Sequence, residues 1–281
     1  MFVILLSLLL NVSFTKKVYY KTFYFAKKFL FITPQFLIFT NFAIDFVIFI
    51  WYTLYMKQFD KLKDILIERG ASFVGFCDIS HLPNNMGYKG AISIGYKLLD
   101  SFIDQIDEKD GPTYQYFHHY RDVNTALDQL SLFACTYLDR LNIKALMIPA
   151  SQSSVSDPYS GAFPHKTAAV LSGEGFIGKS GLFIHEKFGG RVRLATVLVD
   201  YPLASQKPII ENGCGNCTKC RDACPSGAIS GNVYKLGEDR STFFDAEKCS
   251  THMKKAYQQI GRGSVCGICI KVCPMYLNGK Q

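Results

Sequence analysis

The chain has 281 residues, 48% of them hydrophobic and 14% aromatic, and its formal net charge is +8. This length allows one substantial domain and a small one, and it excludes a bare ferredoxin and a short secreted domain held together by disulfides. The positive charge is compatible with an anionic ligand or partner but does not require one.

The first 55 residues differ in composition from the rest. They contain 17 of the 40 aromatic residues and five lysines against the single acid Asp45, and so carry half of the net charge. They can be interpreted as a membrane segment over 29–55, as a signal peptide over 1–14, or as a leader before a true start at Met56. Polar residues interrupt the possible membrane segment. The possible signal peptide lacks a basic start and a small-residue cleavage site. We prefer Met56 as the start, which predicts a cytoplasmic protein, membrane-associated only if 1–55 is translated.

From Met56 onward, alternating polar and apolar segments predict an α/β domain over 56–205. Hydrophobic residues recur at helical spacing in two segments and form short apolar runs, typical of buried strands, in three. At the start of the second helix, His118, His119 and Arg121 either face a cleft that holds an anion or form a solvated turn. The helices are expected over 59–66, closed by Gly70, and over 116–141, and the strands over 72–79, 91–96 and 144–149.

A glycine-rich turn follows in the segment 163–203. Residues 173–180 fit the G-x-x-x-x-G-K-[ST] pattern of a phosphate-binding loop, and G-x-G-x-x-G is also present. Both patterns need a strand before the turn and a helix after it, whereas here HKTAAVLS reads as a helix and the later GLFIH and RVRLATVLV read as strands. The reversed order argues against nucleotide triphosphate binding. We expect instead a turn whose glycines let the backbone approach a bulky cofactor, with two lysines beside it. The expected cofactor-binding residues are Lys166, Gly173, Gly175, Gly178, Lys179 and Ser180.

Eight of the ten cysteines lie in the C-terminal region, 206–281. The first four have the spacing C-x2-C-x2-C-x3-C followed by proline, as in [4Fe–4S] sites of bacterial ferredoxins, whereas the second run lacks one thiolate, for which Cys249 is the obvious replacement. Zinc sites have no need of the third closely spaced cysteine, and repeated C-x2-C pairs are not typical of disulfides. Because the fourth cysteine of each run ligates the other cluster, two sets follow. Cluster 1 is assigned Cys214, Cys217, Cys220 and Cys273, and cluster 2 is assigned Cys224, Cys249, Cys266 and Cys269.

The glycine turn and the cysteines together resemble the epoxyqueuosine reductase family. The resemblance rests on HKTAAVLSGEGFIGKSGLFIH, on the following RVRLATVLVD, and on CGNCTKCRDACPSGAI with the later CGICIKVCP. It implies an α+β fold, in which an α/β nitroreductase-like sandwich that binds cobalamin precedes a C-terminal two-cluster ferredoxin-like domain. Reductive dehalogenases have a similar arrangement. The implied chemistry is relay of electrons from two [4Fe–4S] clusters to a corrinoid that carries out the reduction, with a role in queuosine biosynthesis.

The chain departs from the family pattern where the family has its acid. Tyr159 stands at that position, Asp157 is the nearest carboxylate, and His165 and Lys166 replace a Glu-Arg pair, so the catalytic candidates are Tyr159, Asp157 and His165. The helical-repeat tail of longer relatives is not present, and the excess positive charge is small for a tRNA binder. We therefore expect this chain to share the fold and the clusters of the family, whereas its small or nucleoside-like substrate stays undefined. The expected partners are an electron donor (flavodoxin, ferredoxin or a reductase) and tRNA, but not DNA; the alternative function is a ferredoxin-type electron-transfer protein without its own substrate.

Overall fold

The structure is a computed structural model that describes residues 55–151, 153, 157–235 and 237–276. The chain divides into two compact units, Met1–Lys61 and Leu62–Gln281. The leader, whose interpretation was left open above, lies outside the described residues except for position 55. No helix among the described residues is both long and apolar enough to cross a membrane.

The second unit is built on a four-stranded sheet in which every neighbouring pair is antiparallel. The strand order is β1-β2-β6-β3. Both central strands are buried along most of their length, which explains why their sequences are nearly continuous apolar runs without alternation. The strands are β1 (Phe73–Asp78), β2 (Gly90–Lys97), β3 (Ala145–Ile148) and β6 (Val192–Val199).

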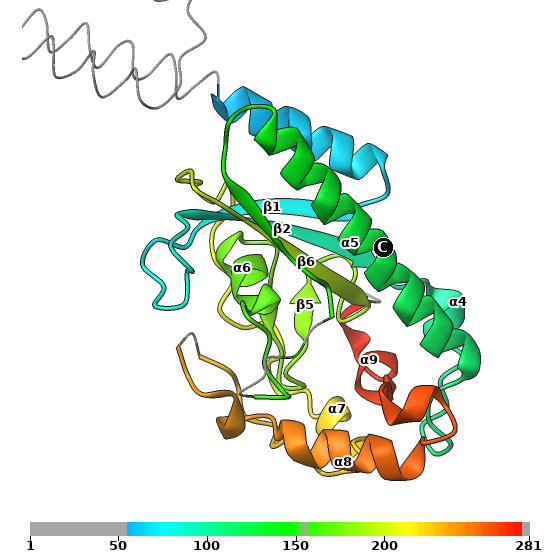
Figure 1. The fold of residues 1–281 in the computed structure, drawn as a ribbon. Coiled ribbons are helices and arrows are strands. Elements are labelled where there is room, and N and C mark those ends of the chain that lie inside the picture. Colours follow the sequence, from blue (N-terminus) through cyan, green and yellow to red (C-terminus); the bar gives the residue numbers. More distant parts are fainter. Residues whose placement is uncertain (1–54, 152, 154–156, 236, 277–281) are drawn as a thin grey trace, which may run out of the picture. The chain divides into compact units, whose positions relative to one another are not determined.

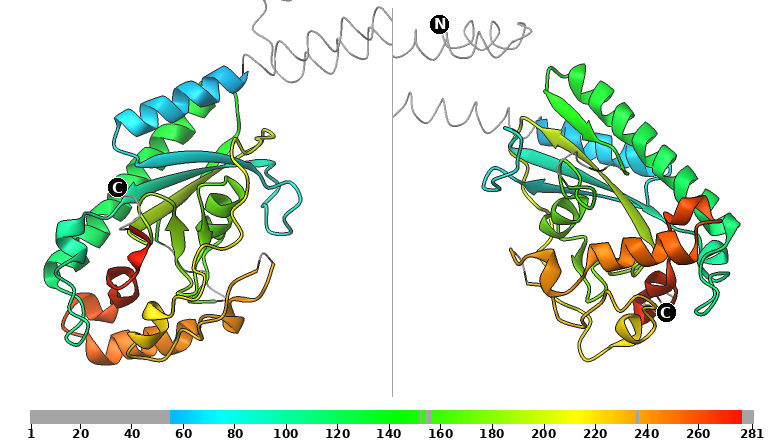
Figure 2. Two further views of the ribbon diagram at one scale, coloured as in Figure 1. Left: turned by 180° about the vertical axis from the view of Figure 1, so that it is seen from behind. Right: turned by 60° about the horizontal axis from the view of Figure 1, so that its bottom comes forward.

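Helices cover both sides of this sheet. The long helix α5 (Tyr114–Asp139) packs along one side, and α6 (His165–Leu171) packs on the other (Figures 1 and 2). The hydroxyl of Thr113 caps α5 by accepting a hydrogen bond from the Tyr116 amide, a common N-terminal signal. The buried stripe of α5 includes Leu127, Leu130, Ala134 and Leu138, as its periodicity predicts. The mixed helix and sheet architecture confirms the expected α+β class.

The elements around the glycine turn have the order that the sequence predicts. Helix α6 precedes the turn, and the short strands β4 (Gly175–Ile177) and β5 (Phe183–His185) follow it as an antiparallel hairpin. A phosphate-binding loop would need the opposite order. The sequence-based argument against nucleotide triphosphate binding at this turn is therefore supported by the fold.

The cysteine region lies below the sheet in Figure 1 and consists of short helices and loops. Its longest helix, α8, begins after Asp245, whose carboxylate accepts a hydrogen bond from the Lys248 amide. The domain boundary expected at 205/206 falls inside the second unit and stays a prediction. The elements of this region are α7 (Lys219–Asp222), η1 (Arg240–Thr242), α8 (Ala246–Ala256), η2 (Gly261–Gly263), α9 (Ile268–Lys271) and η3 (Pro274–Tyr276).

Candidate iron–sulfur centres and adjoining cofactor site

The four cysteines assigned to cluster 1 surround one small cavity. Its wall also contains Lys179, Ser180 and Ile184 from the glycine turn and β5, and Pro274 and Met275 after the last cysteine. Three of the thiols come from one loop, and the fourth comes from the second cysteine run, about fifty residues later. The structure thus brings together the residues of the predicted crossed set: Cys214, Cys217, Cys220 and Cys273.

The four cysteines assigned to cluster 2 also lie near one another. Burial raises the pKa of Cys249 to about 11, with Cys266 and Cys224 contributing because their negative charges oppose its ionisation. The pKa of Cys269 is raised well above its ordinary value by burial and by the charges of Cys266, Cys249 and Cys224. Helix α8 therefore places Cys249 beside the other three cysteines of this set. From the sequence, Cys249 was predicted only because it is the cysteine that remains near the second run.

The chemistry of these thiols fits iron–sulfur clusters. Burial and the charges of Cys214, Cys273 and Cys217 likewise raise the pKa of Cys220 to about 11. Groups of buried thiolates that repel one another are stable only with a bound cation, and a coordinating metal deprotonates its thiols. Among the described residues, no three Cys, His, Asp or Glu side chains converge on a point that suits a single metal ion. In a cluster each cysteine binds a different iron, so no such point is required.

Hydrogen bonds hold the cysteine loops against the α/β part of the unit. Lys179 is 8% exposed, and its ammonium donates to the carbonyl oxygens of Gly215 (2.8 Å) and Cys217 (3.1 Å). The backbone of Gly190 bonds the sulfur of Cys273. Within the cysteine region itself, the Tyr257 hydroxyl bonds the sulfur of Cys266. Lys179 was expected to lie beside a cofactor. In the structure it fastens the first cysteine loop to the glycine turn.

The glycines of the turn are packed against the chain's own segments. A side chain at Gly173, which has φ +72°, would meet the backbone oxygens of Lys207 and Pro208, and one at Gly175 would meet the Ile184 carbonyl. A side chain at Gly178 would meet Ile184 and approach the sulfur of Cys214 at 3.4 Å. The close approach predicted for a cofactor is therefore made here by the linker, β5 and the cysteine loop. The cofactor-binding role of Gly173, Gly175, Gly178 and Ser180 stays a prediction.

The three candidate proton donors occupy different environments. The carboxylate of Asp157 accepts hydrogen bonds from the Ser160 hydroxyl and the Tyr159 amide, and these bonds lower its pKa. Burial lowers the pKa of His165 to about 4; its Nε2 lies 3.0 Å from the Pro149 carbonyl and its Nδ1 lies 2.9 Å from the Thr196 hydroxyl. An ionised carboxylate and an imidazole with both nitrogens engaged are poor acids near neutral pH. Tyr159 is half-buried, and only its backbone groups take part in these bonds.

Two arginines near Lys166 were not predicted from the sequence to belong to the site. Burial lowers the pKa of Lys166 to about 8, with further contributions from the charges of Arg240 and Arg193. The ammonium of Lys166 donates to the Gly181 carbonyl, and Arg240 donates to the Tyr159 carbonyl at 2.7 Å. Arg240 and Arg193 lie 74 and 27 residues from Lys166 in the sequence, so only the fold could reveal that they are neighbours.

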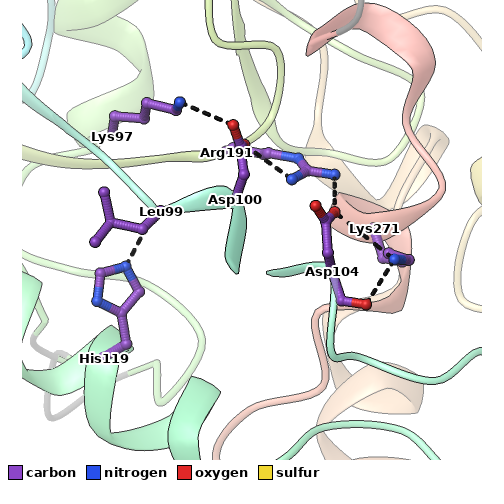
Figure 3. A network of polar contacts seen from close by, with 7 residues as sticks. All are labelled: Lys97, Leu99, Asp100, Asp104, His119, Arg191 and Lys271. Carbon is purple, nitrogen blue, oxygen red and sulfur yellow. Dashed lines mark hydrogen bonds and ion pairs between the residues drawn. The ribbon is translucent and has the colours of Figure 1, made fainter. Parts of the chain in front are cut away.

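A buried ion network joins the sheet to the second cysteine run. Arg191 is fully buried and donates to Asp100 (2.9 Å) and Asp104 (2.8 Å), while Lys271 donates to the Asp104 carbonyl at 2.8 Å. Figure 3 shows the Arg191 guanidinium between the two carboxylates, with Lys271 reaching Asp104 from the other side. Lys271 lies between Cys269 and Cys273, so this network fixes the position of the second run relative to α4 (Asp100–Ile103).

The histidines at the start of α5 line a separate surface hollow. His118 and His119 form it with Phe102, Tyr114, Gln115 and Asp122. His119 accepts a hydrogen bond from the Leu99 amide at 3.0 Å and stacks on Phe102, and burial lowers its pKa. Arg121 is exposed and lies over the Phe117 ring. His119 therefore has a structural role in joining α5 to the segment before α4.

Comparisons with known proteins agree with this architecture. Residues 213–276 match the family model of the 4Fe-4S double cluster binding domain. Epoxyqueuosine reductase of Staphylococcus aureus is 28% identical over 148 residues, which are 53% of this chain and 36% of the relative. Tetrachloroethene reductive dehalogenase of Desulfitobacterium hafniense is 37% identical over 120 residues, 37% of this chain and 21% of the relative. The chain therefore spans about a third or less of the length of these relatives.

Solved structures extend the likeness to most of the fold. The catabolic reductive dehalogenase NpRdhA superposes with a TM-score of 0.57 at 19% identity, over 75% of this chain and 31% of that one. Epoxyqueuosine reductase with an epoxyqueuosine-modified tRNA-Tyr stem loop superposes with a TM-score of 0.51 at 20% identity, over 80% and 66%. The expected similarity to epoxyqueuosine reductases is confirmed, the C-terminal region is a ferredoxin-like domain for two [4Fe–4S] clusters, and the fold is one shared with oxidoreductases.

Proposed function

We propose that the chain is an iron–sulfur oxidoreductase that resembles epoxyqueuosine reductase. The observation that carries the proposal is the placement of the first cysteine set, whose cavity is walled by the glycine turn of the α/β part. A protein that only carries electrons needs no more than the ferredoxin-like region, so a cluster site packed against a larger α/β fold favours an enzyme. A corrinoid bound beside the clusters would supply the reducing metal centre, and the clusters would supply its electrons.

The two cysteine sets suggest a path for electrons within the unit. Cys220 and Cys269 belong to different sets, and the charge of Cys220 acts on Cys269. The two clusters therefore adjoin through these residues. Cys269 also acts on Lys166, whose ammonium bonds the carbonyl at the end of the glycine turn. The proposed path for electrons would therefore run from the clusters toward the region of Lys166.

The chain's own residues would bind and orient the substrate and supply a proton. Among the three candidates we favour Tyr159, because no hydrogen bond joins its hydroxyl to another described residue and its carbonyl accepts a hydrogen bond from Arg240. Asp157 instead stabilises the turn that carries Tyr159. The phenol of Tyr159 would donate a proton to the reduced substrate.

The proposed partners are an electron donor and a nucleic acid substrate. A solved relative holds a tRNA-Tyr stem loop, and this supports a modified nucleoside or its tRNA as the substrate class. A flavodoxin, a ferredoxin or a reductase would supply single electrons, and the proposed site of action is the cytoplasm.

Cobalamin binding tests the proposal. The full chain, purified without oxygen and with its clusters present, is titrated with cob(II)alamin while the corrinoid spectrum is recorded. We expect saturable binding at micromolar concentrations, followed by spectral reduction of the corrinoid when the clusters are reduced. If the clusters are intact and no corrinoid binds, the enzyme proposal fails and the electron-carrier alternative is favoured. The Tyr159→Phe variant serves as a matched control, because it keeps the ring and should leave corrinoid binding unchanged.

A further inference from the structure

Three cationic side chains from separate segments converge near the second cysteine set. Lys166 is on α6, Arg193 is on β6 and Arg240 is on η1 of the cysteine region. His165, the neighbour of Lys166, lies 3.0 Å from the Pro149 carbonyl, and Arg193 donates to the next carbonyl along the chain, that of Ala150. Lys166 bonds the Gly181 carbonyl, Gly181 packs against Phe244, and the Phe244 amide donates to the Arg240 carbonyl at 2.9 Å. These contacts bring the three cations near one another, and the charges of both arginines and of Cys269 act on the Lys166 ammonium. All three side chains are half-buried, so they are partly shielded from water but remain accessible to a ligand.

The bonds of these side chains all go to uncharged oxygens. Lys166 donates to the Gly181 carbonyl and Arg240 to the Tyr159 carbonyl. Arg193 donates to the Asn124 side-chain oxygen at 3.0 Å and to the Ala150 carbonyl at 3.2 Å, and its guanidinium lies over the Tyr120 ring. No described carboxylate forms an ion pair with any of the three cations.

The contrast with Arg191 shows that this lack of acids is local. Arg191, two residues before Arg193, is neutralised by Asp100 and Asp104. The acids that act near the three cations are Asp157 and Asp128. Asp157 is held by Ser160 and the Tyr159 amide, and Asp128 accepts a hydrogen bond from the Ala150 amide at 2.8 Å. The charge of Arg240 acts on Asp157 and that of Asp128 acts on His165, but among the ion pairs between described residues neither carboxylate joins Lys166, Arg193 or Arg240.

Like charges gathered in a partly buried place are costly unless an anion joins them. The guanidinium of Arg240 has five N–H donors and the ammonium of Lys166 has three, and the bonds described above use few of them. A fork of arginine donors beside a lysine matches the oxygens of a phosphate group. We propose that Lys166, Arg193 and Arg240 bind a phosphate ester group of the ligand that is reduced or of its cofactor, next to Cys269.

This inference rests on the proposed function, because it assumes that a ligand is reduced beside a cluster held by Cys269. Two sources share the chemistry: the phosphate of a nucleotide substrate, and the phosphodiester in the nucleotide tail of cobalamin. Both would place an anion in the same positive site. Adenosine 5′-monophosphate imitates the first source, and a comparison of cobalamin with cobinamide, which lacks the tail, isolates the second.

Protection of Lys166 from chemical labelling tests the site directly. The full chain with its clusters is treated at pH 8 with a trace of an amine-acetylating reagent, and mass spectrometry measures the labelling of the peptide that contains Lys166. We expect inorganic phosphate or adenosine 5′-monophosphate to slow this labelling, while chloride at the same ionic strength has no effect. Protection by cobalamin but not by cobinamide or the nucleotide identifies the cofactor tail, and protection by the nucleotide identifies the substrate. If none of these phosphates protects Lys166, the proposal is overturned.

Variants add a second measurement. Arg240→Gln and Arg193→Gln remove a charged hydrogen-bond donor each, and we expect each to weaken protection by phosphate about tenfold or more. Arg69→Gln removes an exposed arginine that lies over Phe133 and should leave protection unchanged. If both variants bind phosphate as the unaltered chain does, the arginines are not part of the site. Iron and sulfide are measured on the same samples, so a chain that lacks clusters but keeps protection refutes the proposed function and leaves the phosphate site standing.

Discussion

The ion network around Arg191 predicts a large loss of stability when its acids are removed. Arg191 has a side-chain exposure of 1%, whereas Asp100 and Asp104 are 26% and 48% exposed. Replacing both acids with asparagine keeps the shape but leaves a buried guanidinium without a carboxylate. Such an unpaired buried charge costs about 3–5 kcal/mol. For a chain of this size, that loss corresponds to a decrease of about 6–20 °C in melting temperature.

The single variants separate the two acids. Asp100→Asn removes a charged hydrogen bond in a partly buried position and should cost about 1.5–3 kcal/mol. Asp104→Asn should cost less, because Asp104 is half exposed and water can replace part of its interaction. The double variant should cost more than the sum of the single variants, since only it leaves Arg191 without any acid.

Thermal unfolding of the anaerobic full chain, followed by circular dichroism, measures these differences. Glu68→Gln removes an exposed carboxylate elsewhere in the second unit and should change stability by less than about 0.5 kcal/mol. If the double variant melts within about 2 °C of the unaltered chain, Arg191 is not neutralised by these acids, and the network does not hold the second cysteine run.

Three further predictions concern the cysteine loops and the linker. Cys249→Ser should lower the iron content by about half and leave cluster 1 in place, because only cluster 2 loses a ligand; unchanged iron would show that another residue completes that cluster. Lys179→Met should speed loss of the first cluster in air, since the Gly215 and Cys217 carbonyls lose their donor, whereas Lys187→Met, altered in an exposed loop, should not. Burial alone would raise the pKa of Glu174, but hydrogen bonds from His185 and Lys207 lower this pKa below its ordinary value. The ionised Glu174 therefore stabilises the fold above the usual carboxyl pKa, and this stabilisation is lost as the pH falls through the lowered pKa. Lys207→Met should therefore move the midpoint of acid unfolding to higher pH, and an unchanged midpoint in circular dichroism would contradict this role.

Local patterns in the sequence predict most of the sheet and its helices. The long apolar stripe after Thr113 and the β-branched run 192–199 define α5 and β6, because periodicity and burial follow from neighbouring residues. The spacing of the cysteines similarly suggests two crossed sets, since the geometry of a ferredoxin loop is local. The short strand β4 and helix α8 were not expected, because β4 has only three residues and α8 is a polar helix that fully buries none of its side chains.

Residues that depend on tertiary contacts could not be found in this way. Arg193 lies in the strand-like run 191–200 and Arg240 in a polar loop, and neither run indicates a contact with Lys166; the two arginines become its neighbours only in the folded chain. The glycines of the turn were understood as needing close approach, which is correct, but the sequence could not show that the linker at Lys207 and Pro208 makes that approach to Gly173. The cofactor-binding role of Lys179 stays a prediction, and its bonds to two carbonyls could not be foreseen because these partners lie more than thirty residues later in the chain.

The central claim is that two crossed sets of cysteines hold two [4Fe–4S] clusters beside the α/β fold. Iron and acid-labile sulfide analysis of the full chain purified without oxygen, combined with Mössbauer spectroscopy, tests it most directly. We expect about eight irons and eight sulfides per chain, all in [4Fe–4S] form. A chain that binds four irons or fewer after full reconstitution, or that binds zinc in their place, would contradict it.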